Sequence, residues 1–396
     1  MTESITSPPT DPQQWLSRLK HVPKELDVVI HVGAPKTGSS AFQTFCFENR
    51  DWLATQGYYY PPHPLGANRI SSGHSELSQA IKEGGHPETI FAKYLANAKS
   101  SGCTLLLSSE TFWSLPVEIH ALIKKSRYCV LALIRHPFDT IVSSYNQLVK
   151  RHFSTTPLLT FIEDYAKARH KRMTEQWLRL WVNTVGLEHL VVNPYHKSSI
   201  YQLGLSTAFM HMLRVTLPQT NGERPPLLNS SYPPHILELK RMLNAVIPEA
   251  QTGIHKRLDT VLQHLSDQYF QDRSEIDVNA LIEVPQEALA LLETHFSGAV
   301  KNNMALCDIE LHSELTTSAS AIPASSMADV ATRLKQDAGL YCHIQRQIQQ
   351  HLNNVWFATP KNDREAIAQM LMQLDQLFPK PNLVTRIKSM LPQKRT

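Results

Sequence analysis

Short runs of consecutive apolar residues, rather than alternating ones, mark the expected strands of this chain. Four such runs stand at residues 27–32, 104–108, 128–134 and 189–193. Strands that are apolar on both sides are typical of a parallel sheet covered by helices on both faces. Segments with apolar residues at helical spacing separate the runs. The pattern therefore predicts an α/β fold with a central parallel sheet flanked by helices.

Helical periodicity is clearest after the third run. Pro137 stands in a favoured first-turn position, and apolar residues recur at helix spacing from Phe138 to Val149. Further helices are predicted after Ser40, over residues 157–184 and over residues 234–246. The middle of the chain is expected to be rich in helix.

Changes in composition divide the chain into four parts. They are an N-terminal extension (1–24), a main α/β domain (25–314), a linker rich in Ser, Thr and Ala (315–327), and a C-terminal helical region (328–396). The last part contains two amphipathic stretches, 328–355 and 363–378. Three roles stay open for them: a lid, an interface between copies of the chain in a homo-oligomer, or part of a binding site.

Composition narrows the class of protein. With 42% apolar and 19% charged residues the chain is expected to be globular, and a net charge of only +4 over 396 residues argues against nucleic acid as a main partner. The five scattered cysteines suit reduced thiols and form no zinc-binding pairs. The start of the chain lacks the pattern of an export signal, and no apolar run approaches the roughly 20 residues of a membrane span. A cytoplasmic protein is expected.

The octet GAPKTGSS, residues 33–40, stands between the first apolar run and the helix that follows it. Backbone amides and the helix dipole make such a junction a natural anion site. An ATP-binding P-loop has a lysine directly after its second glycine and then Ser or Thr to hold magnesium. Here Ser39 follows Gly38, and the lysine is Lys36. The loop predicts a phosphate or sulfate site that needs no metal, with a simple tight turn as the alternative.

A second, independent motif follows the third run. Arg135 opens the sequence RHPFDTIVSSYNQ, and Ser143 stands eight residues later in the predicted helix. An arginine at the carboxyl end of a strand lies where open parallel sheets bind ligands, and the serine adds a second donor. The pair predicts a grip for a second phosphate. The alternative is a solvent-facing arginine and an ordinary polar helix residue.

With both motifs in view, the chain resembles the sulfotransferases that use 3′-phosphoadenosine 5′-phosphosulfate (PAPS), especially their bacterial branch with glycan or small-molecule acceptors. GAPKTGSS is similar to the family's 5′-phosphosulfate loop and RHPFDTIVSSYNQ to its 3′-phosphate motif. The resemblance continues through SGHSELSQAI, LLLSSETFW, VVNPYHK, LLNSSYPPHILELKRMLN and HFSGAVKNNMAL, and so covers residues 27–310. It implies a P-loop NTPase-like sulfotransferase fold with extra C-terminal helices.

The resemblance also implies which residues bind the donor. For the 5′-phosphosulfate they are Lys36, Thr37, Gly38, Ser39 and Ser40, and for the 3′-phosphate they are Arg135 and Ser143. Tyr195, in VVNPYHK, is similar in position to a residue near the adenine, whereas Ala41 stands where the family often has an aromatic residue. The implied ligands are PAPS, its product PAP and an acceptor with a hydroxyl group, without a metal.

Transfer of a sulfuryl group needs a base to take the acceptor proton and positive charge on the leaving phosphate, a part suited to Lys36. Glu110 ends the run LLLSSE, and the family's base is a His or Glu near the end of this strand. Its alternative role is a surface acid that caps the turn at Thr111. His74, in SGHSEL, is the second candidate base because imidazole titrates near neutral pH. His136 is expected to be structural.

Two other functions compete with a sulfotransferase. A P-loop kinase or NTPase would use the same strand, loop and helix, although the displaced lysine speaks against it. A non-catalytic interaction module on the same fold is the second alternative. Within the first reading a carbohydrate hydroxyl is the favoured acceptor, and the aromatic segment GYYYPP (57–62) is expected either to border a sugar or to pack in the core.

Overall fold

The computed structural model describes residues 11–65, 71–168, 174–217, 231–246 and 283–317, together with scattered residues between 250 and 266. The predicted C-terminal helices and the predicted linker beyond Thr317 lie outside the described residues. Contacts divide the chain into two compact units. Unit 1 comprises Met1–Ile141, Asp164–Pro226 and Leu292–Glu314, and unit 2 comprises Val142–Glu163, Leu227–Leu291 and Leu315–Thr396. This division cuts across the predicted domain of residues 25–314, whose outline stays a prediction.

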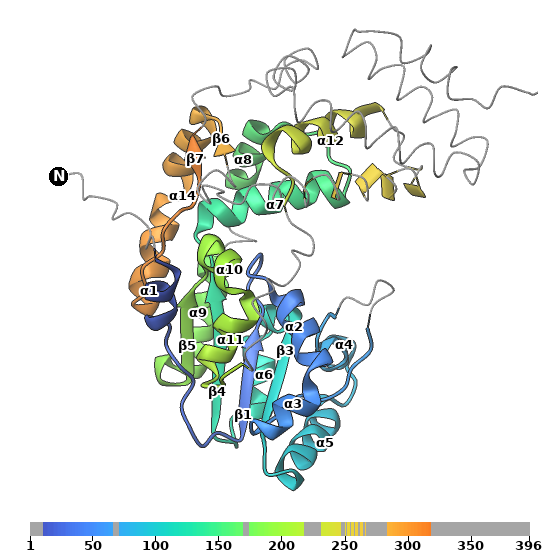
Figure 1. Ribbon diagram of the computed structural model, residues 1–396, viewed down its shortest axis with the longest axis vertical. Helices are drawn as coiled ribbons and strands as arrows, with labels where there is room; N and C mark the ends of the chain where they lie inside the picture. Colours follow the sequence, from blue (N-terminus) through green and yellow to red (C-terminus); the bar gives the residue numbers. More distant parts are fainter. Residues whose placement is uncertain are drawn as a thin grey trace, which may run out of the picture. The chain divides into compact units, whose positions relative to one another are not determined.

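Unit 1 contains a five-stranded sheet in the order β2-β3-β1-β4-β5 (Figure 1). Its strands are β1 (Val28–Val32), β2 (Tyr58–Tyr59), β3 (Thr104–Ser109), β4 (Tyr128–Ile134) and β5 (Leu190–Pro194). Every neighbouring pair is parallel. All four predicted strands are confirmed within a residue or two, as are the α/β class and the parallel sheet.

The strand that the sequence did not predict, β2, lies in the aromatic segment GYYYPP. The Tyr58 hydroxyl donates to the carbonyl oxygen of Leu213 at 2.8 Å. Tyr59 packs partly buried against the core, and Tyr60 is 1% exposed. These three side chains therefore serve core packing, one of the two roles considered for this segment.

Helices surround this sheet and extend into unit 2. In unit 1 they are α1 (Pro12–Ser17), α2 (Ser39–Glu48), α3 (Arg50–Thr55), α4 (Ser75–Glu83), α5 (Pro87–Ser100), η1 (Thr111–Ser114), α6 (Pro116–Ile123), α9 (Thr174–Val185), η3 (Leu187–His189), α10 (Lys197–Leu203) and α11 (Leu205–Met212). Helices α7 (Pro137–Arg151), α8 (Leu158–Lys167) and α14 (Gln286–Cys307) belong to both units, and α12 (Pro234–Val246) to unit 2. No helix in the described part of the chain is long and apolar enough to cross a membrane.

The predicted helices are confirmed in most of their length. Helix α7 starts at Pro137 and α12 covers the predicted residues 234–246. The segment predicted as helical over 157–184 contains α8 and α9, and residues 169–173 between them lie outside the description. The stretch after Ser40 forms two helices, α2 and α3.

Both faces of the sheet are buried, as continuous apolar strands require. All residues of β1 and β4 are buried. Successive side chains of a strand point to opposite faces. Val28 and Ile30 therefore pack in one core with Trp181 of α9, whereas Val29 packs in the other with Phe42 of α2 and Phe209 of α11. The Phe42 and Phe209 rings stack with their centroids 3.8 Å apart.

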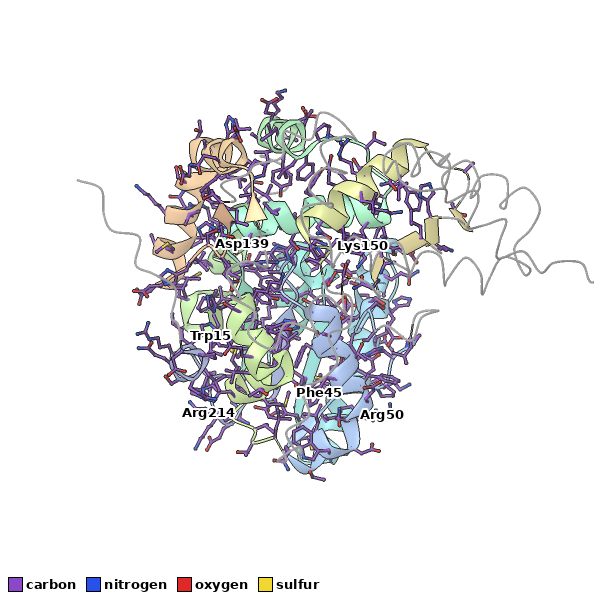
Figure 2. The ribbon with its side chains drawn as sticks, turned by 45° about the horizontal axis from the view of Figure 1, so that its top comes forward. Trp15, Phe45, Arg50, Asp139, Lys150 and Arg214 are labelled. Carbon is purple, nitrogen blue, oxygen red and sulfur yellow. The ribbon has the colours of Figure 1, made fainter. Side chains whose placement is uncertain are left out.

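The described N-terminal segment, residues 11–22, packs onto unit 1. Trp15 is 3% exposed, and its indole N–H donates to the carbonyl oxygen of Pro194 at the end of β5 (3.3 Å). The Asn193 amide binds both backbone groups of Lys20, at 2.6 and 2.8 Å. The guanidinium of Arg214 donates to the carbonyl oxygen of Val22 at 3.1 Å. Figure 2 labels Trp15 and Arg214, two of these anchors. Much of the predicted N-terminal extension is thus part of the packed unit.

Unit 2 holds its described segments together with buried polar side chains. The Asn146 amide binds both backbone groups of Tyr232, at 3.0 and 3.3 Å. Lys240 of α12 is completely buried, with its ammonium 3.5 Å from Nδ1 of His255 and over the ring of Phe153. Strands β6 (Glu283–Val284) and β7 (Thr316–Thr317) form a separate parallel pair.

Because Trp15 anchors the N-terminal segment, we expect Trp15→Ala to lower the free energy of unfolding by roughly 3–5 kcal/mol. Trp15→Phe keeps a buried aromatic ring and loses the hydrogen bond to Pro194. Loss of this hydrogen bond should lower the free energy of unfolding by about 1 kcal/mol, in addition to the effect of the smaller ring. Urea unfolding followed by circular dichroism measures both. The exposed neighbour Gln14→Ala is the control, with an expected change within about 0.5 kcal/mol. Equal midpoints for Trp15→Ala and Gln14→Ala would contradict the packing described.

Candidate functional site

The carboxyl ends of the parallel strands meet at one edge of the sheet, and predicted site residues follow three of them. Lys36 lies in the loop after β1, Glu110 directly follows β3, and Arg135 directly follows β4. The register pairs Ile134 of β4 with Pro194 of β5, so Arg135 and Tyr195 continue from neighbouring positions. Open α/β sheets bind their ligands at this edge, where the strand order reverses.

The loop after β1 brings the first turn of α2 close to β3. A Cβ atom on Gly33 would stand 2.5 Å from the Ser39 hydroxyl oxygen and 3.0 Å from Cα of Glu110, so only glycine permits this approach. Gly38 has φ of 78°, in the left-handed region, directly before α2 starts. The Ser39 hydroxyl is buried, and no described residue forms a hydrogen bond with it. The first N–H groups of α2 have no acceptor within the helix, and together with this hydroxyl they can donate hydrogen bonds to a bound anion.

Lys36 and Thr37 have different roles within the loop. The Thr37 hydroxyl donates to the carbonyl oxygen of Ala34 at 2.7 Å, which commits it to the shape of the loop. Lys36 is half-buried and adopts φ of 64°. Burial lowers the pKa of the Lys36 ammonium, the nearby charge of Glu110 raises it and that of Arg135 lowers it further. Lys36 therefore lies between a carboxylate and a second cation.

Arg135 is a buried cation without a carboxylate partner. It is 5% exposed, and one of its terminal nitrogens lies 3.5 Å from the carbonyl oxygen of Lys36. Its guanidinium lies over the ring of Tyr195, 5.3 Å from the centroid, and its Nε is buried without an acceptor. Among the described residues no carboxylate lies at ion-pair distance from it. Buried charges are normally paired, so this site favours an anionic ligand.

Glu110 and Arg135 lie on opposite sides of the loop after β1, because they follow β3 and β4, the two strands that flank β1 in the sheet. Its side chain is exposed, and one carboxylate oxygen accepts a hydrogen bond from the Ser40 hydroxyl at 3.4 Å. The carboxylate does not cap the turn that follows, because the Thr111 N–H donates instead to the Ser109 hydroxyl (3.3 Å). The structure thus brings Glu110, Ser40 and Lys36 together, as the predicted site requires, and the capping alternative is not seen.

His74, the second candidate base, is completely buried. Its Nδ1 accepts from the Ser108 N–H at 3.1 Å, and Nε2 donates to the carbonyl oxygen of Pro61 at 3.1 Å. Burial is the main cause that lowers its pKa to about 3. Both ring nitrogens of this neutral imidazole are used to pin the segment before α4 to β3. The geometry gives His74 a structural part and leaves Glu110 as the better-placed base.

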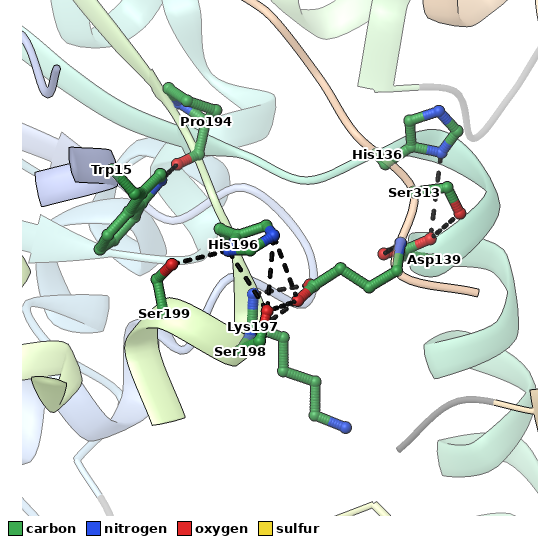
Figure 3. Close-up of polar contacts among 10 residues, drawn as sticks. Trp15, His136, Asp139, Pro194, His196, Lys197, Ser198, Ser199 and Ser313 are labelled. Carbon is green, nitrogen blue, oxygen red and sulfur yellow. Dashed lines mark hydrogen bonds and ion pairs between the residues drawn. The ribbon is translucent and has the colours of Figure 1, made fainter. Parts of the chain in front are cut away.

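The structure also shows a buried polar cluster that the sequence did not predict (Figure 3). The Glu314 carboxylate accepts hydrogen bonds from the backbone N–H groups of Lys197 (2.6 Å) and Ser198 (2.7 Å) at the start of α10. Asp139, in the first turn of α7, accepts from the Ser313 hydroxyl (2.6 Å) and from the Glu314 N–H (3.1 Å). The segment 313–314 is therefore clamped between two helices of unit 1.

Two histidines border this cluster, in agreement with a structural role for His136. Its Nδ1 accepts from the Phe138 N–H at 3.3 Å and lies 3.9 Å from the Asp139 carboxylate. The Nε2 atom of His196 lies 3.6 Å from Glu314. Burial lowers the pKa of both imidazoles, and that of His136 falls to about 3.

Ser143 lies near the middle of α7, in the part of this helix that belongs to unit 2. The 3′-phosphate role predicted for it stays a prediction. Lys197, Asp139 and Glu314 are the polar residues of this edge that sequence reasoning missed. Lys197 stands in the quoted segment VVNPYHK and Asp139 in RHPFDTIVSSYNQ, so position relative to a strand end was an available signal for both.

Comparison with known proteins adds no assignment. No family model, no curated protein and no solved structure matches this chain.

Because His74 joins two segments by its hydrogen bonds, we expect His74→Ala to lower the free energy of unfolding by roughly 2–5 kcal/mol. The substitution removes a buried ring and leaves the Ser108 N–H and the Pro61 carbonyl without partners. Thermal unfolding followed by circular dichroism measures the effect. His86→Ala, at an exposed position before α5, is the matched control and should change little. If His74→Ala unfolded at the same temperature as His86→Ala, the structural role would be refuted.

Proposed function

We propose that this chain is a PAPS-dependent sulfotransferase that transfers a sulfuryl group to a hydroxyl of a carbohydrate or small molecule. The observation that supports it most is the buried Arg135, without a carboxylate at ion-pair distance among the described residues, next to a glycine-lined loop that carries Lys36. Two cations at adjoining strand ends suit a ligand with more than one anionic group. The proposed fold, in its finer classification, is the P-loop NTPase-like sulfotransferase fold.

In the proposed complex the loop and the start of α2 bind the 5′-phosphosulfate of the donor. The unpartnered Ser39 hydroxyl, the Ser40 hydroxyl and Lys36 supply donors there, with backbone N–H groups of Thr37 and Gly38. Arg135, with Ser143 as the predicted second donor, binds the 3′-phosphate. The Tyr195 ring lies against the Arg135 guanidinium, and in the proposed complex Tyr195 lies near the adenine.

The reaction is an in-line displacement at sulfur. Glu110 accepts the proton of the acceptor hydroxyl as its oxygen bonds to sulfur, while the bond between sulfur and the bridging oxygen breaks. The electron pair of that bond stays on the 5′-phosphate of PAP. The positive charge of Lys36 stabilises this developing negative charge. Lys36 is therefore the residue that acts on the leaving group. The two charges, Glu110 and Lys36, interact in the structure, which suits these complementary tasks.

Nucleotide selectivity tests the proposed ligand. PAP at about 100 times its dissociation constant should stabilise the folded state by roughly 2.7 kcal/mol and raise the melting temperature by about 3 °C. Mg·ATP should give a smaller shift, because no lysine follows Gly38. Arg135→Met should abolish most of the PAP shift without lowering the melting temperature of the free protein, since it removes an unpaired buried charge.

The control for Arg135→Met is Arg18→Met, which changes an exposed arginine and should leave the PAP shift intact. A larger shift with Mg·ATP than with PAP would favour the kinase or NTPase alternative. Shifts with neither ligand would favour an interaction module and refute the proposed function.

Catalysis by Glu110 is tested by Glu110→Gln, which keeps the size of the side chain and removes the base. We expect turnover to fall by roughly 10²- to 10⁴-fold, with PAP affinity and melting temperature unchanged because the side chain is exposed. Release of labelled PAP from PAPS across a panel of sugars, phenols and alcohols gives the rates. Glu118→Gln, exposed on α6, is the control. Full activity of Glu110→Gln on every accepted hydroxyl would remove Glu110 from the mechanism.

A further inference from the structure

Lys197 is the first residue of α10. It follows β5, the strand next to β4, which Arg135 follows. Strand β5 ends at Pro194, which pairs in register with Ile134, so the residues that follow both strands lie at the same edge. Arg135 lies over Tyr195, two residues before Lys197. The charges of Arg135 and Lys197 interact, and that interaction is one cause of the altered pKa of Lys197. Two cations from neighbouring strand ends therefore share one region.

The backbone and the side chain of Lys197 serve different purposes. Its N–H donates to Glu314 at 2.6 Å, which fixes the start of α10. Figure 3 shows the side chain extending away from this contact, with its ammonium at the free end. In the described part of the chain, no residue accepts a hydrogen bond from this ammonium or forms an ion pair with it. The side chain is half-buried, and its ammonium is available to an anion.

The two carboxylates that interact electrostatically with Lys197 accept hydrogen bonds from other groups. Glu314 accepts hydrogen bonds from two backbone N–H groups and from the Ser198 hydroxyl. Asp139 accepts from the Ser313 hydroxyl and from the Glu314 N–H. Their oxygens point at backbone and hydroxyl donors, and the positive charge of Lys197 and Arg135 is offset only through space.

Burial and the charge of Arg135 oppose the charged form of Lys197, and the charges of Glu314 and Asp139 favour it. Burial is the first cause that lowers the pKa of Lys197, to about 8, and the positive charge of Arg135 is the second. A phosphate group between the two cations would relieve both their mutual repulsion and their loss of hydration, because charge-assisted hydrogen bonds to phosphate are strong.

We propose that Lys197 acts with Arg135 to bind one phosphate group of the nucleotide, and that this second cation selects a 3′-phosphorylated adenine nucleotide over a monophosphate. The inference rests on the proposed function, because it adds a residue to the same donor site. Lys36 and the loop after β1 bind the 5′ end of either nucleotide, whereas Lys197 contacts only a ligand that carries the further phosphate.

Calorimetric titration with two probes, PAP and 5′-AMP, separates the two ends of the site. Lys197→Met should weaken PAP binding roughly ten- to a hundredfold and leave 5′-AMP binding within about twofold. Lys197→Arg keeps the positive charge and should restore PAP binding to within a few-fold of the original. Lys36→Met should weaken both ligands. Lys124→Met, an exposed lysine between α6 and β4, is the control and should affect neither.

The outcomes separate this inference from the proposed function. If the unaltered protein binds PAP and Lys197→Met binds it equally well, or loses PAP and 5′-AMP in equal proportion, Lys197 does not select the further phosphate and the inference alone is overturned. If the unaltered protein binds neither nucleotide, the proposed function fails and the inference fails with it. Unchanged melting temperatures of Lys197→Met and Lys197→Arg show that the variants are folded.

Discussion

The desolvation of Arg135 is the constraint around which the candidate site is arranged. A guanidinium at 5% exposure has lost most of its water, and among the described residues no carboxylate takes the place of that water at ion-pair distance. The fold holds the charge through the end of β4, the Tyr195 ring and one long contact with the Lys36 carbonyl. Among the described residues the site leaves a buried positive charge without an ion-pair partner, and the proposed anionic ligand would supply that partner. The adjoining loop after β1 carries the Ser39 and Ser40 hydroxyls as further donors.

The neighbouring carboxylates of Asp139 and Glu314 are held by hydrogen bonds, and among the described residues neither lies at ion-pair distance from Arg135. Glu314 forms the N-terminal cap of α10, and Asp139 fixes the backbone of Glu314 in turn. The hydrogen bonds that Glu314 forms with α10 and with Asp139 connect residues that are 116 to 175 positions apart in the sequence. The hydrogen bond between Asp139 and Glu314 thus joins distant parts of unit 1. Both carboxylates are committed to hydrogen bonds and act on the positive charge of Lys197 through space, as Asp139 also does on that of Arg135.

The sequence allowed much of the sheet and part of the site to be predicted, for physical reasons that differ by residue. Strands β1 and β4 are buried on both faces, which leaves uninterrupted apolar runs. Arg135 and Lys36 stand out in the sequence because a charged residue directly after such a run, or in a glycine-containing loop, has few structural uses, and their roles in binding stay predictions. Glu314 has no local signal, because its partners lie far away in the chain. His74 was misleading for the opposite reason, since a sequence does not show that both ring nitrogens bind backbone groups.

The contrast between Glu110 and Lys36 bears on the order of events in the proposed reaction. Lys36 is half-buried and lies beside Arg135, so its surroundings are formed before any acceptor arrives. Glu110 is exposed, and among the described residues its carboxylate accepts a hydrogen bond from the Ser40 hydroxyl alone. In the proposed mechanism, an acceptor that binds over Glu110 displaces water from the carboxylate and strengthens the hydrogen bond between the carboxylate and the acceptor hydroxyl. The acceptor therefore completes the catalytic environment when it binds.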